Sequence, residues 1–210
     1  MMTVSNVPAA GGISPLQRDE DERLLTGWGR TSPSAARVVP VTSIAQVQDV
    51  IAAAGTRGVL ARGLGRSYGD AAQSGGADVL DLSAMCGVTL DPATATVSAG
   101  AGLSLDALMR VVVPAGFFVP VTPGTRMVTV GGAIAADVHG KNHHVEGTFG
   151  AHVSAMTLVD GRGVEEARRT EERVHRPFAI IGDEHETAPR RRTASDGVRG
   201  VSDTCGTEIV

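Results

Sequence analysis

Two glycine-rich stretches of the sequence carry residue types that could wrap a large anionic group. Residues 61–70 read ARGLGRSYGD, and residues 124–144 read GTRMVTVGGAIAADVHGKNHH. Glycines let a ligand approach main-chain N–H groups closely, and the arginines and serine of the first stretch place side-chain donors at its rim. A loop of N–H groups with cationic donors beside it suits a diphosphate.

Neither stretch matches a standard nucleotide-binding motif. The dinucleotide fingerprint G-x-G-x-x-G fails in the first stretch because Tyr68 stands where the third glycine belongs. Residues 135–142, AADVHGKN, approach the P-loop pattern, but they lack its first glycine, and Asn142 replaces the Ser or Thr that would hold magnesium. We therefore expect neither a Rossmann site nor NTP hydrolysis.

Three histidines at the end of the second stretch leave several chemistries open. His139 and His143 have the i,i+4 spacing of metal ligands on a helix, with His144 adjacent. Gly140 interrupts that helix and no fourth ligand is obvious, so we expect no metal. The alternatives are a buried, hydrogen-bonded histidine and a histidine beside a redox cofactor, where an imidazole tunes flavin electronics or moves a proton.

Three further residues have two interpretations each. Asp137, two residues before His139, could orient or charge that imidazole. Lys141 is the only lysine and lies in the same loop, either beside an anion or in solvent. Trp28, the only tryptophan, lies between two glycines and either anchors an N-terminal leader to the core or forms a wall of the cofactor site.

Strands and helices must bring these residues together, and their alternation predicts an α+β domain. Apolar spacing and capping residues predict helices over residues 44–54, after Thr42 or Ser43, over residues 105–112, after Ser104, and over residues 129–136. Short strands are expected at residues 38–42, 59–61, 79–82, 88–90, 96–99, 117–121 and 153–159. The helix over 129–136 would direct the positive end of its dipole, at Gly131 and Gly132, toward a ligand.

The region after these elements changes character. Residues 139–149 are expected to form an ordered loop, and Asp160-Gly161 signals a type I′ hairpin. The sequence EEARRTEERVHR then predicts a charged helix in place of a returning strand, with Glu165 paired to Arg169 and Glu172 to Arg176. Residues 182–197 have the composition of a disordered segment.

Charge distribution divides the chain into three parts. Residues 161–210 hold 19 charged residues, against 23 in the 160 residues before them. We therefore expect a flexible leader over 1–23, one domain over 24–161, and a charged tail over 162–210 that is disordered or non-native. A truncated or frameshifted product would explain such a tail.

Composition narrows the classes of function. Aromatic residues are only 3% of the chain and the net charge is −4, which argues against nucleic acid as a partner. Cys86 and Cys205 lie far apart and indicate neither a disulfide framework nor a metal clip. No apolar run has the length of a membrane span, and no signal peptide is readable at the start, which predicts a cytoplasmic location.

Four motifs together resemble a known flavoprotein family. LTGWGR, ARGLGRSYGD, PGTRMVTVGGAIAADVHGKNHH and GTFGAHV are similar to the flavin-binding half of the decaprenylphosphoryl-β-D-ribose 2′-oxidases, within the vanillyl-alcohol-oxidase-like FAD family. The resemblance runs from about residue 24 to residue 161 and implies an incomplete FAD-binding domain of the PCMH type. The absent remainder implies weak FAD retention by this chain alone.

The resemblance also implies roles for individual residues. His139 matches a histidine that approaches the flavin, Lys141 a lysine of the substrate pocket, and Tyr68 a residue beside the isoalloxazine; these roles make His139 and Lys141 the catalytic candidates. Ala136 stands where some relatives carry cysteine. The implied FAD contacts are Ala61, Arg62, Gly63, Leu64, Gly65, Arg66, Ser67, Tyr68, Gly69, Asp70, Ala71, Gly124, Thr129, Val130, Gly131, Gly132, Ala136, Asp137, Val138 and His139.

The implied reaction is FAD-dependent oxidation of the ribose 2′-hydroxyl of decaprenylphosphoryl-ribose to a 2′-keto sugar, in the synthesis of the cell-wall arabinan precursor. The implied partners are the polyprenyl-phosphate sugar and an NADH-dependent keto-reductase subunit. A lipid substrate implies peripheral association with the membrane of the cell envelope. Two alternatives stay open: a related sugar-alcohol or lactone oxidase, and a noncatalytic remnant.

Overall fold

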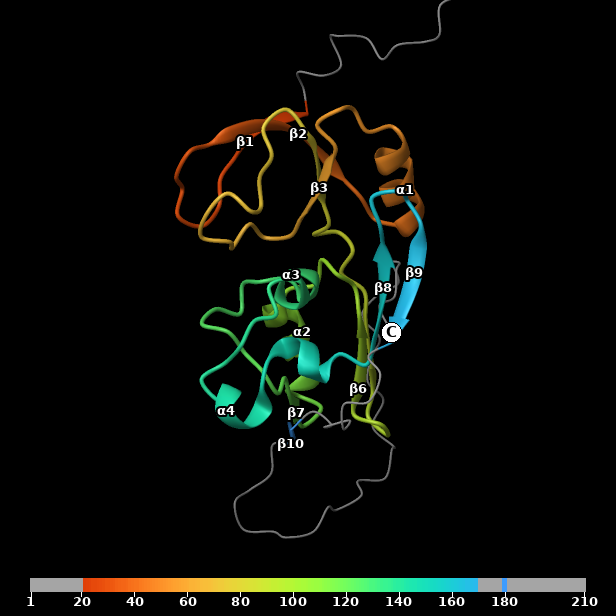
Figure 1. Cartoon of the computed structure of the whole chain (residues 1–210). Helices are drawn as coiled ribbons and strands as arrows, with labels where there is room; N and C mark the ends of the chain where they lie inside the picture. The colour runs from red at the N-terminus through yellow and green to blue at the C-terminus, as the bar shows by residue number, and fades with distance from the viewer. Residues whose placement is uncertain (1–20, 170–178, 181–210) are drawn as a thin grey trace, which may run out of the picture.

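The computed structural model describes residues 21–169 and 179–180, and the chain forms two lobes joined by a hairpin along one side (Figure 1). The first lobe is a four-stranded sheet in the order β1-β2-β4-β3, with β1 antiparallel to β2 and the other pairs parallel. Its strands are β1 (Glu22–Leu25), β2 (Ser34–Pro40), β3 (Val59–Arg62) and β4 (Asp78–Asp81). Strand β1 therefore begins inside the expected leader.

Helix α1 (Ile44–Ala52) packs on this sheet because its apolar residues recur on one face. A small core of Val41, Leu80 and Met85 lies between helix and sheet. The Ser43 side chain accepts a hydrogen bond from the N–H of Gln46, which confirms the predicted N-cap.

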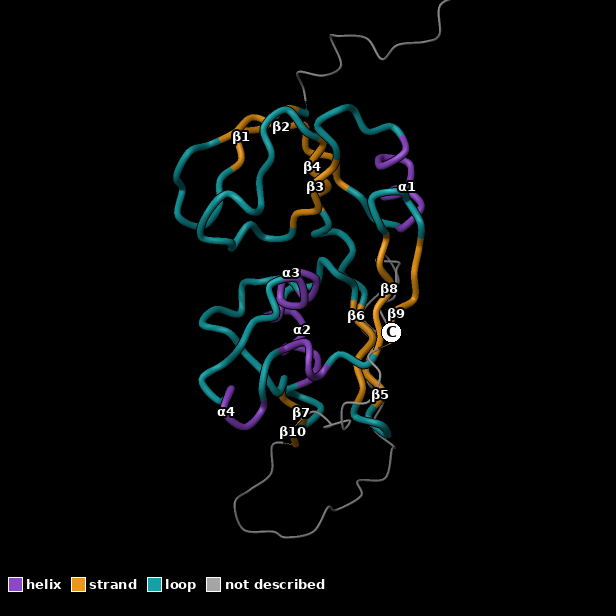
Figure 2. Tube along the Cα trace, in the orientation of Figure 1, coloured by secondary structure: helices purple, strands orange, loops and turns teal. Residues whose placement is uncertain are grey.

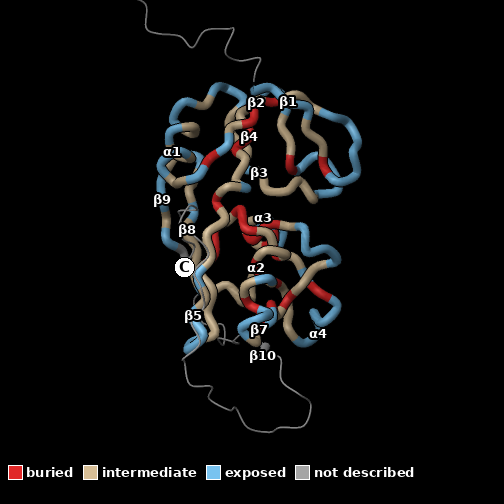
Figure 3. The backbone as a smooth tube through the Cα atoms, turned by 180° about the vertical axis from the view of Figure 1, so that it is seen from behind, coloured by how far each residue is buried: buried red, intermediate tan, exposed pale blue. Residues whose placement is uncertain are grey.

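The second lobe surrounds helices α2 (Leu105–Val112) and α3 (Val130–Ala135), where the buried residues gather (Figure 3). Ser104 caps α2, as predicted, by accepting from the N–H of Ala107, and Thr129, expected as the first residue of the next helix, caps α3 by accepting from the N–H of Gly132. The other elements of the lobe are β5 (Val88–Asp91), β6 (Thr96–Ala99), β7 (Phe117–Phe118), α4 (His143–Glu146), η2 (Phe149–His152) and β10 (Ala179–Ile180).

The structure of this lobe differs from two local predictions. The strand expected over 117–121 is regular only at Phe117–Phe118, where it pairs with β10. The loop expected over 139–149 contains the short helix α4. Within the described residues, no helix is long and apolar enough to cross a bilayer.

The hairpin of β8 (Ala155–Val159) and β9 (Glu165–Arg169) runs beside both lobes (Figure 1). The charged helix predicted from Glu165 is therefore wrong, because cross-strand pairing with β8 supplies the backbone hydrogen bonds that an exposed, charged helix would have to make alone. The hairpin is joined to α1 by a hydrogen bond of 2.9 Å from Gln48 Nε2 to the carbonyl of Gly163.

The turn of this hairpin is also not the predicted type I′. A type I′ turn at Asp160-Gly161 needs positive φ in its central residues, but the left-handed residue is Gly163, with φ 75°. The carbonyl of Asp160 accepts from the N–H of Gly163, and its carboxylate accepts from those of Arg162 and Val164. The predicted Glu172–Arg176 pair, the disordered segment and most of the leader lie outside the described residues, so those expectations and the truncation hypothesis stay predictions.

Candidate functional site

The two glycine-rich stretches meet between the lobes, where the loop that follows β3 approaches the start of α3 (Figure 2). Gly63, at the end of β3, lies so close to Thr129 that a Cβ added there would overlap the threonine side chain. A third segment joins them, because Gly27 lies against the carbonyl of Gly69 with no room for a side chain. Residues far apart in sequence thus form one junction, as the sequence predicted.

Two arginines hold this junction together from the inside. Arg62 donates from Nη2 to the carbonyl of Thr26 at 2.9 Å and from Nη1 to the carbonyl of Ala72. Arg66 donates from Nε to the carbonyl of Met127 at 3.0 Å. Both guanidinium groups thus donate to main-chain carbonyls, and their expected role as ligand donors at the rim stays a prediction.

Arg62 is half-buried, which affects the pKa of its guanidinium. Burial lowers the pKa of its guanidinium from the ordinary value, and the nearby Asp81 carboxylate opposes that effect. A cation that already makes two hydrogen bonds inside the loop fixes the loop's shape more than it attracts a ligand.

Trp28 lies on the outside of the same loop. The main-chain N–H of Trp28 donates to the carbonyl of Ser67 at 2.7 Å, and the Arg66 guanidinium lies 4.7 Å from the centre of the indole ring. The indole is 52% exposed. These contacts place Trp28 against the first glycine-rich loop, and both interpretations of its role stay predictions.

The first glycine-rich loop has a set of unused main-chain donors. None of the N–H groups of residues 63–72 donates a hydrogen bond to an acceptor among the described residues, although residues 63–66 are half-buried. Most buried backbone N–H groups in proteins are paired, so a partly buried loop of free N–H groups fits an anionic ligand.

The N-terminus of α3 does not offer such donors. The N–H groups of Val130, Gly131 and Gly132 donate to the carbonyls of Leu103 and Ala101 and to Thr129 Oγ1, at 2.8, 2.9 and 3.1 Å. These N–H groups are therefore not free for a ligand, whereas the expected direction of the helix dipole toward a ligand stays a prediction. Gly131 is required for a different reason, since it packs directly on Ala101.

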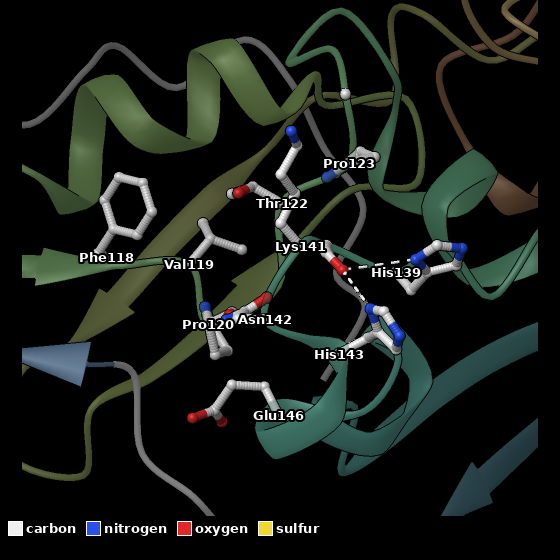
Figure 4. Close-up of a pocket in the computed structure, with 12 residues that line it drawn as sticks. Phe118, Val119, Pro120, Thr122, Pro123, His139, Lys141, Asn142, His143 and Glu146 are labelled. Carbon is white, nitrogen blue, oxygen red and sulfur yellow. Dashed lines mark hydrogen bonds between the residues drawn. The ribbon is translucent and has the colours of Figure 1, made fainter.

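A pocket of about 830 Å³ lies next to the second stretch and contains both residues predicted to be catalytic (Figure 4). His139 and Lys141 line it on either side of Gly140, and the Lys141 side chain extends toward Thr122 and Pro123. Its other lining residues are Phe118, Val119, Pro120, Gly124, Asn142, His143 and Glu146.

The imidazoles of this pocket share one acceptor. His139 Nδ1 and His143 Nδ1 lie 3.4 and 3.1 Å from the carbonyl oxygen of Gly140, and the two ring centroids are 5.2 Å apart. A carbonyl only accepts, so both Nδ1 atoms carry the proton and both Nε2 atoms are acceptors in the neutral rings. Among residues of the described chain, no three His, Cys, Asp or Glu side chains are grouped to hold a metal ion.

Asp137 does not orient His139, contrary to one prediction. Its Oδ1 accepts from the N–H of Gly150 at 2.9 Å, and its own φ is 41°, so it links the end of α3 to η2. Of the other predicted contacts, Tyr68 is 81% exposed and lies outside the pocket lining, and Ala136 and Val138 are also outside it.

Among the pocket residues, Glu146 and Phe118 were not predicted, and Asn142 and His143 were considered for other roles. Asn142 and His143 belong to the HGKNHH motif, which already signalled them, but they were considered only for magnesium and metal binding. Glu146 and Phe118 carried no local signal, because they lie on α4 and β7, and only the tertiary structure brings both to one pocket.

Comparison with known proteins decides the family. The model of the "FAD binding domain" family matches residues 35–167, well over half of the chain. The chain belongs to this family of FAD-binding domains. FAD is therefore the family's cofactor, and the free N–H groups of residues 63–72 fit its diphosphate.

Two curated relatives support the resemblance seen in the motifs. Decaprenylphosphoryl-beta-D-ribose oxidase of Mycolicibacterium smegmatis is 51% identical over 143 residues, which cover 66% of this chain and 31% of the relative. The uncharacterized protein in the mprA 5′ region of Streptomyces coelicolor is 49% identical over 61 residues, which cover 29% of this chain and 17% of that protein. The resemblance to this oxidase is confirmed.

Solved structures confirm the α+β flavoprotein fold. BBE-like 1 of Physcomitrella patens superposes with a TM-score of 0.59 at 23% identity, and an Asp-to-Asn variant of it with 0.60 at 22%. Each match covers 70% of this chain and 33% of the other. The chain thus spans about a third of the length of the oxidase and of the BBE-like protein.

Proposed function

We propose that this chain is the FAD-carrying part of an oxidase that converts the 2′-hydroxyl of decaprenylphosphoryl-ribose to a ketone. The observation that carries the proposal is the 51% identity to an oxidase named for that substrate. The lysine and paired imidazoles that line one pocket are consistent with it, because they offer a cation and proton acceptors for a phosphorylated alcohol.

The residues that would hold FAD fall into two groups. The N–H groups of residues 63–71 would bind the diphosphate, while Gly124 and residues 136–139 would lie along the flavin. Thr129 to Gly132 would act by supporting the first loop, since their N–H groups are engaged within the chain. When bound, FAD supplies the acceptor for the hydride removed from the sugar carbon.

The chain's own residues would bind the substrate and take its proton. Lys141 would pair with the phosphoryl group as a point charge. His139 has its Nδ1–H directed at the Gly140 carbonyl, which leaves Nε2 to accept the proton of the sugar hydroxyl. The 2′-keto product calls for a reduction next, so we include an NADH-dependent reductase as partner and, for the lipid substrate, association with the membrane of the cell envelope.

The proposal is tested by turnover of farnesylphosphoryl-ribose with a dye as electron acceptor and FAD present. We expect dye reduction with this analogue and about a hundredfold loss in Lys141→Ala, the scale of a lost charge-assisted contact. Ribitol and a sugar lactone serve as competing substrates. Turnover of these neutral compounds in preference to the phosphorylated sugar would establish the related sugar-alcohol or lactone oxidase instead.

A further inference from the structure

His152 is a buried histidine that contacts Glu146, a residue of the pocket lining, and neither the family match nor the reaction assigns it a role. Its side chain is only 9% exposed. Nε2 lies 2.9 Å from the carbonyl oxygen of Glu146 and 3.9 Å from its carboxylate, whereas Nδ1 is buried with no hydrogen-bond partner among the described residues. The carbonyl contact requires the proton on Nε2, so Nδ1 is a bare acceptor.

Helix α4, which ends at Glu146, cannot hold its own position. It has four residues, far fewer than an isolated helix needs, and its N-cap Asn142 makes no side-chain capping bond. The Asn142 side chain instead donates to the carbonyl of Pro120 at 2.9 Å. His152 makes the corresponding contact at the other end, so α4 is fastened at both ends by side-chain donors.

This short helix carries a large part of the pocket wall. Asn142, His143 and Glu146 all line the pocket, and His143 reaches the Gly140 carbonyl beside His139. A displacement of the C-terminal end of α4 would therefore move both an imidazole and a carboxylate relative to Lys141.

We propose that His152 is a positioning residue, whose Nε2–H holds the C-terminal end of α4 and thereby sets the places of Glu146 and His143 in the pocket. Its significance for catalysis rests on the proposed function, but the positioning itself does not. The unpaired Nδ1 supports this inference, because a buried polar atom without a partner is destabilising. Packing alone would be served better by an apolar side chain of similar size.

The test compares His152→Leu with His152→Gln in the full chain. Leucine fills the space and removes both ring nitrogens, whereas glutamine places an amide N–H near the position of Nε2. We expect amide hydrogen exchange at Val145, Glu146 and Gly147 to become about five to ten times faster in His152→Leu, the factor for one net hydrogen bond. It should return toward the wild-type rate in His152→Gln, with the thermal midpoint of His152→Leu unchanged or raised.

Unchanged exchange in His152→Leu, or equally fast exchange in both variants, would overturn the proposal. Should His152→Leu fail to fold, nitrogen-15 NMR of the wild-type imidazole decides, since a proton on Nδ1 rather than Nε2 contradicts the assigned contact. Turnover of farnesylphosphoryl-ribose with excess FAD separates this from the function: an inactive wild type would count against the proposed function while leaving the exchange result intact.

Discussion

A single residue, Arg66, connects three segments of the site. It comes from the first glycine-rich loop, donates to the carbonyl of Met127 in the second stretch, and lies over the ring of Trp28 in the N-terminal segment. One planar guanidinium can make both contacts at once, whereas a lysine offers only a point charge. The loop that carries the unused N–H groups is thus tied by this cation to both neighbouring segments.

The first prediction concerns this contact. Arg66→Ala should weaken FAD binding about tenfold, the scale of one lost charge-assisted hydrogen bond, and should shift the emission of Trp28 to longer wavelength because its ring loses cover. Trp28 is the only tryptophan, so fluorescence reports on it alone. Arg66→Lys serves as the matched variant, and an Arg66→Ala protein with unchanged emission and FAD affinity would show that the loop is held by other contacts.

Close packing of Gly63 on Thr129 gives the second prediction. Gly63→Ala should lower the free energy of unfolding by about 1–3 kcal/mol, because the added methyl overlaps a buried side chain. The double variant Gly63→Ala, Thr129→Ala should recover part of that loss, although it also gives up an N-cap bond. Gly55→Ala, with open space around it, is the control in urea unfolding. Equal effects at the two glycines would contradict the packing argument.

The β8–β9 hairpin shows at the scale of elements how one side chain organises a turn. The main-chain N–H groups of Arg162 and Val164 both donate to the Asp160 carboxylate, at 2.8 and 3.0 Å. The hydrogen bond from Val164, followed by that from the Arg162 side chain, lowers the pKa of Asp160 below its ordinary value of 3.8. The carboxylate form therefore stabilises the turn.

A pH dependence follows for this element. A depressed pKa in the folded state means that the contribution of Asp160 is complete above pH 3.8 and is lost as the pH falls through the lowered value. We expect the amide resonances of Arg162 and Val164 to shift in that window in the wild type. Asp160→Asn keeps the acceptor oxygen without the titrating charge, so its resonances should stay constant; identical titration in both proteins would assign the effect to another group.

The whole molecule presents a cofactor site whose described parts, the loop of residues 63–72 and the pocket beside α4, come from the two lobes. The loop of residues 63–72 and the pocket beside α4 are both open at the surface, and the chain spans only about a third of the length of the relatives that carry this domain. A dinucleotide held mainly by main-chain N–H groups on one side gains little from burial, which is the main source of affinity for flat ring systems.

Weak cofactor retention is the prediction at this scale. The 210-residue chain, expressed by itself, should purify without flavin colour and should bind added FAD with a dissociation constant in the micromolar range or weaker, of order −8 kcal/mol or less favourable. Quenching of Trp28 fluorescence during FAD titration measures it. A yellow protein that keeps stoichiometric FAD through gel filtration would contradict this expectation.

Local chemistry was sufficient to predict much of the fold from the sequence. Ser43, Ser104 and Thr129 were read as helix starts, and all three make capping bonds, because a cap depends on residues only three positions away. The two glycine-rich stretches and the HGKNHH motif are likewise recognisable from the sequence alone, and they correctly predict the family and its cofactor, FAD.

What the tertiary structure alone decided depends on contacts between distant residues. Arg66 and Met127 are 61 positions apart, and nothing in the loop's own sequence shows that its arginines serve main-chain carbonyls. The strand at Glu165–Arg169 replaced a predicted helix because β8 was there to pair with it. Glu146 reached the pocket lining, and His152 reached Glu146, for the same reason: local spacing determines which elements form, and packing between elements determines which side chains meet.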